Sequence, residues 1–206
     1  MVKLTETDTI EKLIKEYAIP NIPNRTIPLN QEGYAEPSES EVLPDPTKYQ
    51  SLAGSLLYIN QMTRPDISVH VNLLARQTYK PVMNNIRTAL QVGQYLASTK
   101  NEGLLITISR KESQEVRIDI FADTLYGGEN SLSQSGTLVT VYGTPIMWNS
   151  RRQDVVSMSI TEADYIACSK AAKDAQWIRQ LLEELSMKTR PKLYTDNEAA
   201  LKLTKS

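Results

Sequence analysis

The sequence predicts an α/β fold, in which a small helical module precedes a domain built from a sheet and a long helix. Two changes of hydrophobic period carry this prediction. Apolar residues repeat at helical spacing between residues 49 and 96, alternate with period two from about residue 104 to residue 149, and return to helical spacing from Thr161 to about Met187. From residue 116 onward, the expected order of elements is therefore β-β-β-α-β-α.

The N-terminal segment predicts a short amphipathic helix over residues 8–18, which Pro20 ends. Between Thr26 and Thr47 there is no Lys or Arg, and five acidic residues are interspersed with four prolines. This composition is typical of an extended acidic linker. The apolar positions of the expected helix are Ile10, Leu13, Ile14 and Tyr17.

The module that follows the linker is expected to hold three helices, and the second of them opens after Arg64, Pro65 and Asp66. His70 falls inside this second helix, where a packed histidine is more common than a catalytic one, so we assign it no role. The three apolar stripes are Tyr49, Leu52, Ala53, Leu56 and Leu57; Ile67, Val71 and Leu74; and Ile86, Ala89, Leu90, Gly93 and Leu96.

The sheet domain is expected to open with segments of period two. Residues 104–108 alternate, and after a polar turn a strand runs over residues 116–123. Residues 137–141 and 146–149 predict the next two strands, with a turn at residues 143–145 between them. Residues 116–149 therefore predict a three-stranded antiparallel meander.

The long helix is expected from Thr161 to about Met187, and residues 191–195 predict a short strand after it. A helical pattern resumes at Asn197. Trp148 and Trp177 have Ile and Leu neighbours, so core packing is a commoner role for them than stacking on a base or sugar.

The composition excludes several classes of protein. The formal net charge is -1, and the chain has one cysteine and one histidine, so an internal disulfide and a Cys/His zinc site are both excluded. Any metal is expected on carboxylates. No apolar run is long enough to cross a membrane, and the N-terminus lacks the pattern of a signal peptide. We therefore expect no membrane partner and a cytoplasmic or nuclear protein that is not secreted.

Three acidic residues are expected at similar places in the fold. Asp123 ends the first strand of the meander, Glu162 lies in the first turn of the long helix, and Asp196 follows the short strand. Ligands of α/β sheets bind beyond the carboxyl ends of the strands, and carboxylates there suit Mg²⁺ or Mn²⁺. Two such ions could hold a phosphodiester and activate a water molecule for its hydrolysis.

Each carboxylate also has a structural alternative. Glu162 lies three residues after Ser159 and could close a capping box on the long helix. Asp196 could be the N-cap of the last helix, and Asp123 could begin a turn. The spacing by itself leaves both interpretations open.

Five separated segments carry a family resemblance. Together they resemble the C-terminal part of copia-type (Ty1/copia) retrotransposon Pol polyproteins, in the family's order. The segments are Tyr49–Tyr58 (YQSLAGSLLY), Thr63–Asp66 (TRPD), Trp148–Gln153 (WNSRRQ), Thr161–Tyr165 (TEADY) with Ala171–Leu182 (AAKDAQWIRQLL), and Tyr194–Ala200 (YTDNEAA).

The resemblance implies a division of the chain into four parts. Residues 1–25 would be the end of a reverse transcriptase with a thumb-like helix, residues 26–47 the linker, and residues 48–103 a helical connection module. Residues 104–206 would be a ribonuclease H-like (RNase H-like) domain, whose mixed sheet adds a parallel strand to the three antiparallel ones. The family pattern continues past Ser206 with a basic segment and a fourth carboxylate, so we expect this domain to be C-terminally truncated.

The resemblance also implies an activity, namely hydrolysis of the RNA strand of an RNA–DNA hybrid with two Mg²⁺ or Mn²⁺ ions. The nuclease carboxylates of the family match Asp123, Glu162 and Asp196. Asp123 would bridge both ions, Glu162 would help to hold the ion next to the leaving oxygen, and Asp196 the ion that activates water. The expected partners are the hybrid and the remainder of a reverse transcriptase polyprotein, which could be associated with virus-like particles.

Four basic residues are candidate contacts to the nucleic acid backbone, although a plain solvated surface explains them equally well. They are Arg151, Arg152, Lys170 and Lys173. The sequence departs from the family pattern at Leu125 and Tyr126, where a second Asp and a Trp are usual. This departure keeps open a catalytically inactive RNase H-like remnant that serves as a scaffold or interaction module. Another metal-dependent nuclease of the same superfamily is a third alternative.

Overall fold

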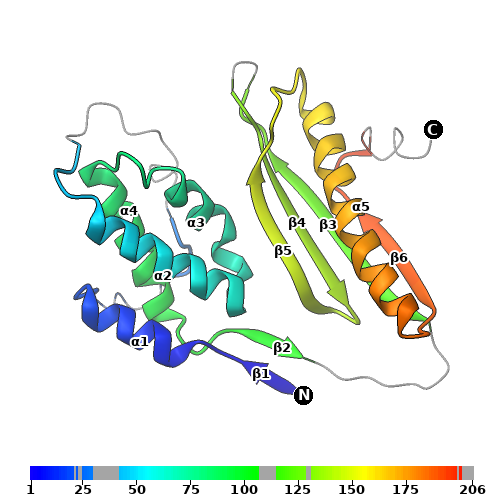
Figure 1. Ribbon diagram of the computed structural model, residues 1–206, viewed down its shortest axis with the longest axis horizontal. Coiled ribbons are helices and arrows are strands. Elements are labelled where there is room, and N and C mark those ends of the chain that lie inside the picture. The colour runs from blue at the N-terminus through cyan, green and yellow to red at the C-terminus, as the bar shows by residue number, and fades with distance from the viewer. Residues whose placement is uncertain are drawn as a thin grey trace. The chain divides into compact units, whose positions relative to one another are not determined.

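The computed structural model of the chain describes residues 1–20, 22, 25–29, 42–106, 115–128, 131–198 and 200. The chain divides into two compact units, which we call the helical unit (residues 3–104) and the sheet unit (residues 1–2 and 105–206) (Figure 1). The strands β1 (Val2–Leu4) and β2 (Leu104–Ile106) pair in a small two-stranded sheet. Residues 30–41, which make up most of the expected acidic linker, and Ile108 lie outside the described residues.

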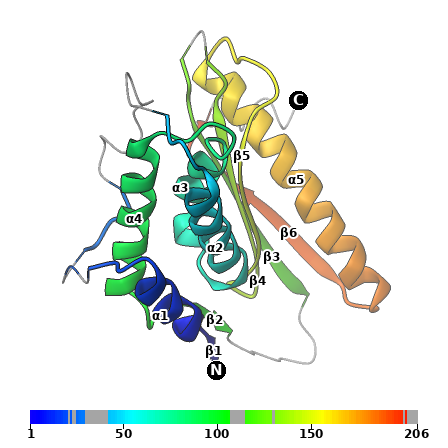
Figure 2. The same ribbon diagram turned by 60° about the vertical axis from the view of Figure 1, so that its left-hand side comes forward.

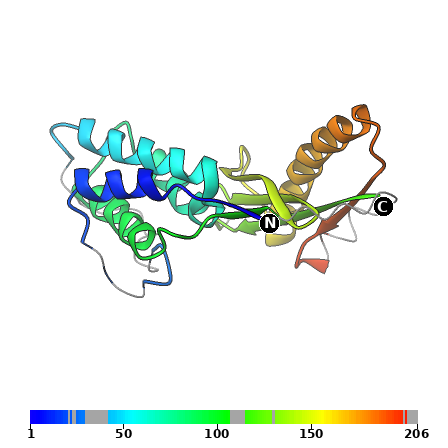
Figure 3. The same ribbon diagram turned by 90° about the horizontal axis from the view of Figure 1, so that it is seen from below.

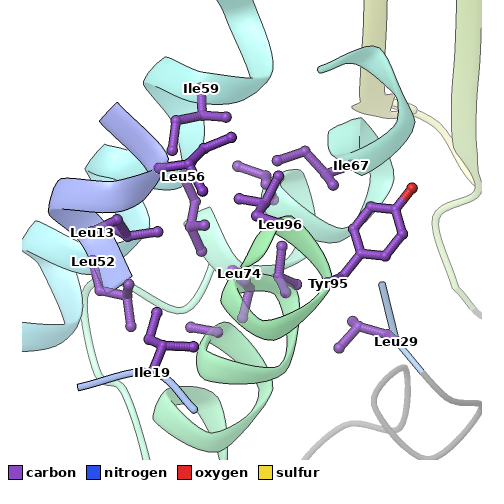
Figure 4. Close-up of a cluster of buried hydrophobic side chains, with 14 of the residues drawn as sticks. Leu13, Ile19, Leu29, Leu52, Leu56, Ile59, Ile67, Leu74, Tyr95 and Leu96 are labelled. Carbon is purple, nitrogen blue, oxygen red and sulfur yellow. The ribbon is translucent and has the colours of Figure 1, made fainter. Parts of the chain in front are cut away.

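The helical unit packs its helices around one apolar core, in which α2 contacts α1, α3 and α4 (Figure 2). The expected stripes supply this core, and Leu52, Leu56 and Leu96 are almost fully buried in it (Figure 4). Burial of each such side chain contributes about 2 kcal/mol to folding. The elements are α1 (Thr7–Glu16), α2 (Thr47–Thr63), the 3-10 helix η2 (Pro65–Ile67), α3 (Ser68–Ala75) and α4 (Met83–Ser98).

The helix α1 belongs to the same core. Ile10 and Leu13 are buried in the same cluster as the residues of α2, α3 and α4. The amphipathic stripe of α1 was expected, but only the packing against α4 and α2 shows what it covers. His70 in α3 is also buried, and this burial lowers its pKa to about 4, which fits a packed histidine.

The TRPD segment of the helical unit contains an ion pair between the buried Arg64 and Asp66, whose side chain is 36% exposed. The side chain of Arg64 is 1% exposed, and its Nη2 lies 2.7 Å from Oδ2 of Asp66. Arg64 also donates to the carbonyl and hydroxyl oxygens of Thr99, and the hydroxyl of Tyr95 donates to Asp66. These contacts join the turn after α2 to the end of α4, which is a structural role within the helical unit.

The sheet unit contains the expected order of three strands, a long helix and a further strand. The spatial order of the strands is β5-β4-β3-β6, with antiparallel pairs except for β3 and β6, which run parallel. The sheet is therefore mixed, as the fold class required. The elements are β3 (Val116–Leu125), β4 (Gln134–Val141), β5 (Thr144–Arg152), α5 (Ile160–Glu184) and β6 (Thr189–Tyr194).

Several boundaries differ from the sequence expectation, including the end of β3 and the turn between β4 and β5. The strand β3 continues past Asp123 to Leu125, because Leu125 still pairs with Gln134 of β4. The turn between β4 and β5 is at Tyr142 and Gly143, both with positive φ (51° and 79°), rather than at residues 143–145. Such a two-residue turn with positive φ matches the twist of a hairpin, so Thr144 already pairs with Val141.

The helix α5 covers one face of the sheet, as the nearly edge-on view in Figure 3 shows. Ile118 and Ile120 of β3 and Ala167 and Ala171 of α5 share this apolar core. Because side chains alternate along a strand, the residues between them lie on the opposite face, which we call the open face. By the strand registers, the open face carries Arg117, Asp119, Phe121, Asp123, Trp148, Ser150, Arg152, Arg190, Lys192 and Tyr194.

The prediction of core packing is wrong for Trp177, which is 57% exposed on α5. The helix turns its small residues Ala171 and Ala175 toward the sheet, and Trp177 lies on another side, next to the buried Ile178. Trp148 is half-buried on the open face. Within the described residues, no helix is long and apolar enough to cross a membrane.

Candidate metal and nucleic-acid site

The three candidate carboxylates belong to segments that meet at one end of the sheet unit. β3 and β6 are parallel neighbours, and their last recorded pair is Phe121 with Tyr194. Asp123 lies two residues after Phe121 within β3, and Asp196 lies two residues after Tyr194, in the bend that follows β6. Neighbouring strands are separated by about 4.8 Å. All three carboxylates, including that of Glu162, are exposed.

Hydrogen bonds join the first turn of α5 to both strand ends. The hydroxyl of Thr124, which follows Asp123, donates to the carbonyl oxygen of Ala163 at 3.2 Å. The side-chain amide of Asn197, which follows Asp196, donates to Oδ2 of the buried Asp164 at 2.8 Å. The immediate neighbours of all three candidate carboxylates are therefore in contact with α5 or part of it.

The pKa of the Cys168 thiol, one turn further along α5, depends on the carboxylates near this end of the sheet. Burial raises its pKa, and the nearby carboxylates of Asp164 and Asp196 raise it further, against a hydrogen bond from Thr195 that lowers it. Cys168 is 1% exposed and packs as a small apolar core residue. Asp196 thus lies close enough to α5 for its charge to act on this buried thiol.

The structure shows half of the capping box that the sequence allowed: Ser159 caps α5, but the carboxylate of Glu162 does not bond the amide of Ser159. The amide of Glu162 donates to the hydroxyl of Ser159, and its carboxylate accepts from the amide of Met158 at 2.7 Å. Asp196 is not the N-cap that the sequence allowed, because Asn197 accepts the hydrogen bond from the amide of Ala200. Asp123 lies within β3 rather than in a turn, and its Oδ1 accepts from the amide of Thr124.

The donor chemistry at this end of the sheet suits a hard divalent cation, since it consists of carboxylate oxygens. In the described part of the chain, however, no group of three or more His, Cys, Asp or Glu side chains is arranged to hold a metal ion. The carboxylate of Glu162 already accepts a hydrogen bond at the start of α5, from the amide of Met158. Because a cap hydrogen bond is worth about 1 kcal/mol, an ion could recruit this exposed side chain at small cost.

The four candidate basic residues differ in their exposure to solvent and in their ion pairing. Arg151, Arg152 and Lys173 are exposed. Lys170 instead lies 3.5 Å from the carboxylate of Asp154, and its Nζ is shielded from solvent. By strand register Arg152 shares the open face with Asp123, whereas Arg151 lies on the face that α5 covers.

Sequence reasoning missed Gln153, which connects the parts of this end of the sheet. The residue is 1% exposed, and its Nε2 donates to Ser135 of β4 at 2.9 Å and to the carbonyl oxygen of Ala163 at 2.8 Å. Its Oε1 accepts from the hydroxyl of Ser157 at 2.9 Å. A glutamine after two arginines suggests a surface position, and only the fold places it beneath the first turn of α5.

Replacing Gln153 with Leu is expected to lower the free energy of unfolding of the sheet unit by about 2 kcal/mol, because it leaves buried polar partners unsatisfied. Urea unfolding of the full chain measures this effect. The matched control is Gln176→Leu at an exposed position of α5, which should change the stability by less than about 0.5 kcal/mol. Equal effects of the two substitutions would contradict the structural role of Gln153.

These elements define a class of protein: an α/β domain with a four-stranded mixed sheet, one face covered by a long helix, and acidic residues in the segments near the carboxyl ends of two parallel strands. No family model matches the chain, and no solved structure matches it. Relatives among known proteins assign the family. The chain belongs to the copia-type retrotransposon Pol family.

The relatives are much longer polyproteins. The chain is 35% identical over 162 residues to the retrovirus-related Pol polyprotein from transposon RE1 of Arabidopsis thaliana. The aligned residues make up 77% of this chain and 11% of that protein. The chain is 30% identical over 161 residues to the corresponding polyprotein from transposon TNT 1-94 of Nicotiana tabacum, or 77% of this chain and 12% of that protein. The chain thus spans about a ninth of the length of these relatives.

A further relative is short. The secreted RxLR effector protein 161 of Plasmopara viticola is 30% identical over 132 residues, which cover 63% of this chain and 90% of that protein.

Proposed function

We propose that the sheet unit is an RNase H-like nuclease domain that hydrolyses the RNA strand of RNA–DNA hybrids as part of a retrotransposon Pol protein. The observation that supports this proposal is that the residues next to Asp123 and Asp196 are hydrogen-bonded to the first turn of α5, which carries Glu162. The Pol relatives supply the polyprotein context. The RNase H-like fold, the RNA–DNA hybrid as substrate and the divalent metal ions all belong to this proposal.

Asp123, Glu162 and Asp196 would hold Mg²⁺ or Mn²⁺. When bound, two such ions supply an activated water molecule and stabilise the charge on the leaving oxygen. The chain itself has two tasks at this site. The first is metal binding, in which Glu162 would give up the hydrogen bond that it accepts from the amide of Met158, while Ser159 would continue to cap α5.

The second task is to hold the substrate. Arg152 lies on the open face with Asp123, so its guanidinium can bind a phosphate of the strand that reaches the carboxylates. Arg151 and Lys173 are exposed cations that can add to the attraction for the nucleic acid backbone. Lys170 contributes less, because Asp154 already compensates its charge.

The test uses the full chain, a hybrid with a labelled RNA strand, and Mg²⁺ or Mn²⁺. We expect cleavage of the RNA strand of the hybrid, no cleavage of the same RNA as a single strand, and loss of activity with a chelator. Cleavage of duplex DNA in preference to the hybrid would assign the domain to another metal-dependent nuclease. No cleavage with either metal would contradict the proposal.

A second candidate function is an inactive RNase H-like module that binds a partner protein. Two observations favour it: the described side chains form no ready metal cluster, and a short relative with 90% coverage is named as an effector rather than as a polyprotein. The hybrid assay separates the two candidates, since the inactive module should bind neither metal nor hybrid.

A further inference from the structure

A second concave site lies on the open face, at the end of the sheet away from Asp123. It is a cavity of about 620 Å³ lined by residues of β3 and β6 and of the β4–β5 turn. This volume falls in the range of small-ligand pockets. The residues that matter for the argument are Arg117, Asp119, Tyr142, Arg190, Lys192 and Tyr194.

The charges around this cavity favour an anion. The carboxylate of Asp119 is buried and already compensated, because Nε of Arg117 lies 2.9 and 2.7 Å from its two oxygens and the hydroxyl of Tyr194 donates to it at 3.1 Å. Arg190 and Lys192 are exposed and form no ion pair with any described residue. Glu115 is the other carboxylate of the lining, so two uncompensated cations face one anion.

Aromatic rings adjoin these cations. The ring of Phe121 stacks on that of Tyr194, with centroids 5.0 Å apart and 13° between the planes. Nζ of Lys192 lies 4.6 Å from the centre of the Tyr194 ring. Phe121 and Tyr142 are 42% and 40% exposed, which is unusual for aromatic rings on a sheet. Exposed rings beside cations are the chemistry with which proteins bind single strands of nucleic acid.

The cations and rings form a continuous path to the candidate metal site. Phe121 lies between Asp119 and Asp123 on the same face of β3, and Tyr194 holds the corresponding place on β6. Asp123 lies four residue steps along β3 from Asp119, which is about 13 Å. We call the residues Arg190, Lys192, Tyr194, Phe121 and Tyr142 the basic-aromatic strip.

We infer that the basic-aromatic strip binds a single strand of nucleic acid that extends from the hybrid at the candidate metal site. Arg190 and Lys192 bind its phosphates, and a base stacks against Phe121 or Tyr142. The continuity of this strand with the hybrid rests on the proposed function. The binding itself needs neither metal nor cleavage, so it can be measured separately.

The test measures the binding of a fluorescein-labelled single-stranded RNA of about 12 nucleotides to the full chain by anisotropy, without divalent metal. For Arg190→Gln with Lys192→Gln, we expect affinity to fall at least about tenfold. The slope of the logarithm of the association constant against the logarithm of the salt concentration should become less negative by about 1.4. This corresponds to about 0.7 for each of two lost phosphate contacts. For Phe121→Leu, affinity should fall while the salt slope stays unchanged, because stacking releases no counterions.

The matched control is Lys12→Gln with Lys15→Gln, which removes the same charge from exposed positions of α1. Equal weakening by the control, or an unchanged affinity and slope in the Arg190/Lys192 variant, would overturn the inference. If the wild-type chain cleaves no hybrid but binds single-stranded RNA through the strip, the proposed function fails and the inferred binding stands. If it cleaves hybrid and the strip variants bind RNA like the wild type, only the inference fails.

Discussion

Replacing Asp123 with Asn is expected to reduce cleavage of the RNA strand by more than about a hundredfold. Loss of residues that only support metal ligands costs about 10- to 100-fold, and Asp123 is proposed as a ligand itself. The substitution keeps the shape of the side chain and removes its negative charge. Because Asp123 is exposed at the end of β3, the free energy of unfolding should change by less than about 0.5 kcal/mol.

The measurement is single-turnover cleavage of the hybrid at saturating Mg²⁺, with urea unfolding in parallel. The matched control is Asp8→Asn, which makes the same chemical change at an exposed position of α1 and should leave the cleavage rate unaltered. Cleavage by Asp123→Asn at the wild-type rate would remove Asp123 from the proposed site. A loss of cleavage accompanied by unfolding would show a structural effect instead.

Replacing Asp66 with Leu is expected to destabilise the helical unit by about 3 kcal/mol, because removal of one partner leaves a buried charge uncompensated. The side chain of Arg64 is 1% exposed and would keep the carbonyl and hydroxyl oxygens of Thr99 as hydrogen-bond acceptors. The double variant Arg64→Met with Asp66→Leu should recover most of this loss, since both charges are then absent. Urea unfolding of the three proteins at neutral pH measures the coupling between the two residues.

The same pair predicts a dependence of stability on acid pH. Burial would raise the pKa of the Asp66 carboxyl, but the hydrogen bonds and charge of Arg64 outweigh burial and hold this pKa below its ordinary value. A carboxyl with a depressed pKa stabilises the folded state above the unfolded pKa of about 4, and this contribution disappears as the pH falls further. The wild type should therefore lose stability below about pH 4 more steeply than the double variant. Parallel pH profiles would contradict this.

The periodicity of apolar residues predicted every helix and strand of the described sheet unit except the exact ends. Strand ends depend on pairing: Asp123 and Thr124 resemble the start of a turn, but β4 continues to bond beside them to Leu125. The exposure of Trp177 was missed for a related reason, because a helical stripe specifies a face only approximately and the facing sheet decides which residues fit beneath it.

In the candidate site too, some residues could be recognised from the sequence and others only from the structure. The sequence by itself selected the three carboxylates, because acidic residues at strand and helix ends can be recognised from local pattern. Gln153 and Asn197 could not be recognised in this way, since their roles consist of hydrogen bonds to residues that lie far from them in the sequence. The pairing of Arg117 with Arg190 and of Asp119 with Lys192, which creates the second cavity, is likewise a product of strand register.

The sequence alone determined the class of fold, the order of its elements and the family resemblance, because these follow from period, turn residues and short motifs within single segments. Only the tertiary structure decided that the parallel strand β6 pairs with β3, and that the carboxylate of Glu162 accepts a hydrogen bond from the amide of Met158. The physical reason is that parallel pairing and helix packing join segments about 70 residues apart, and no local pattern specifies which partners meet.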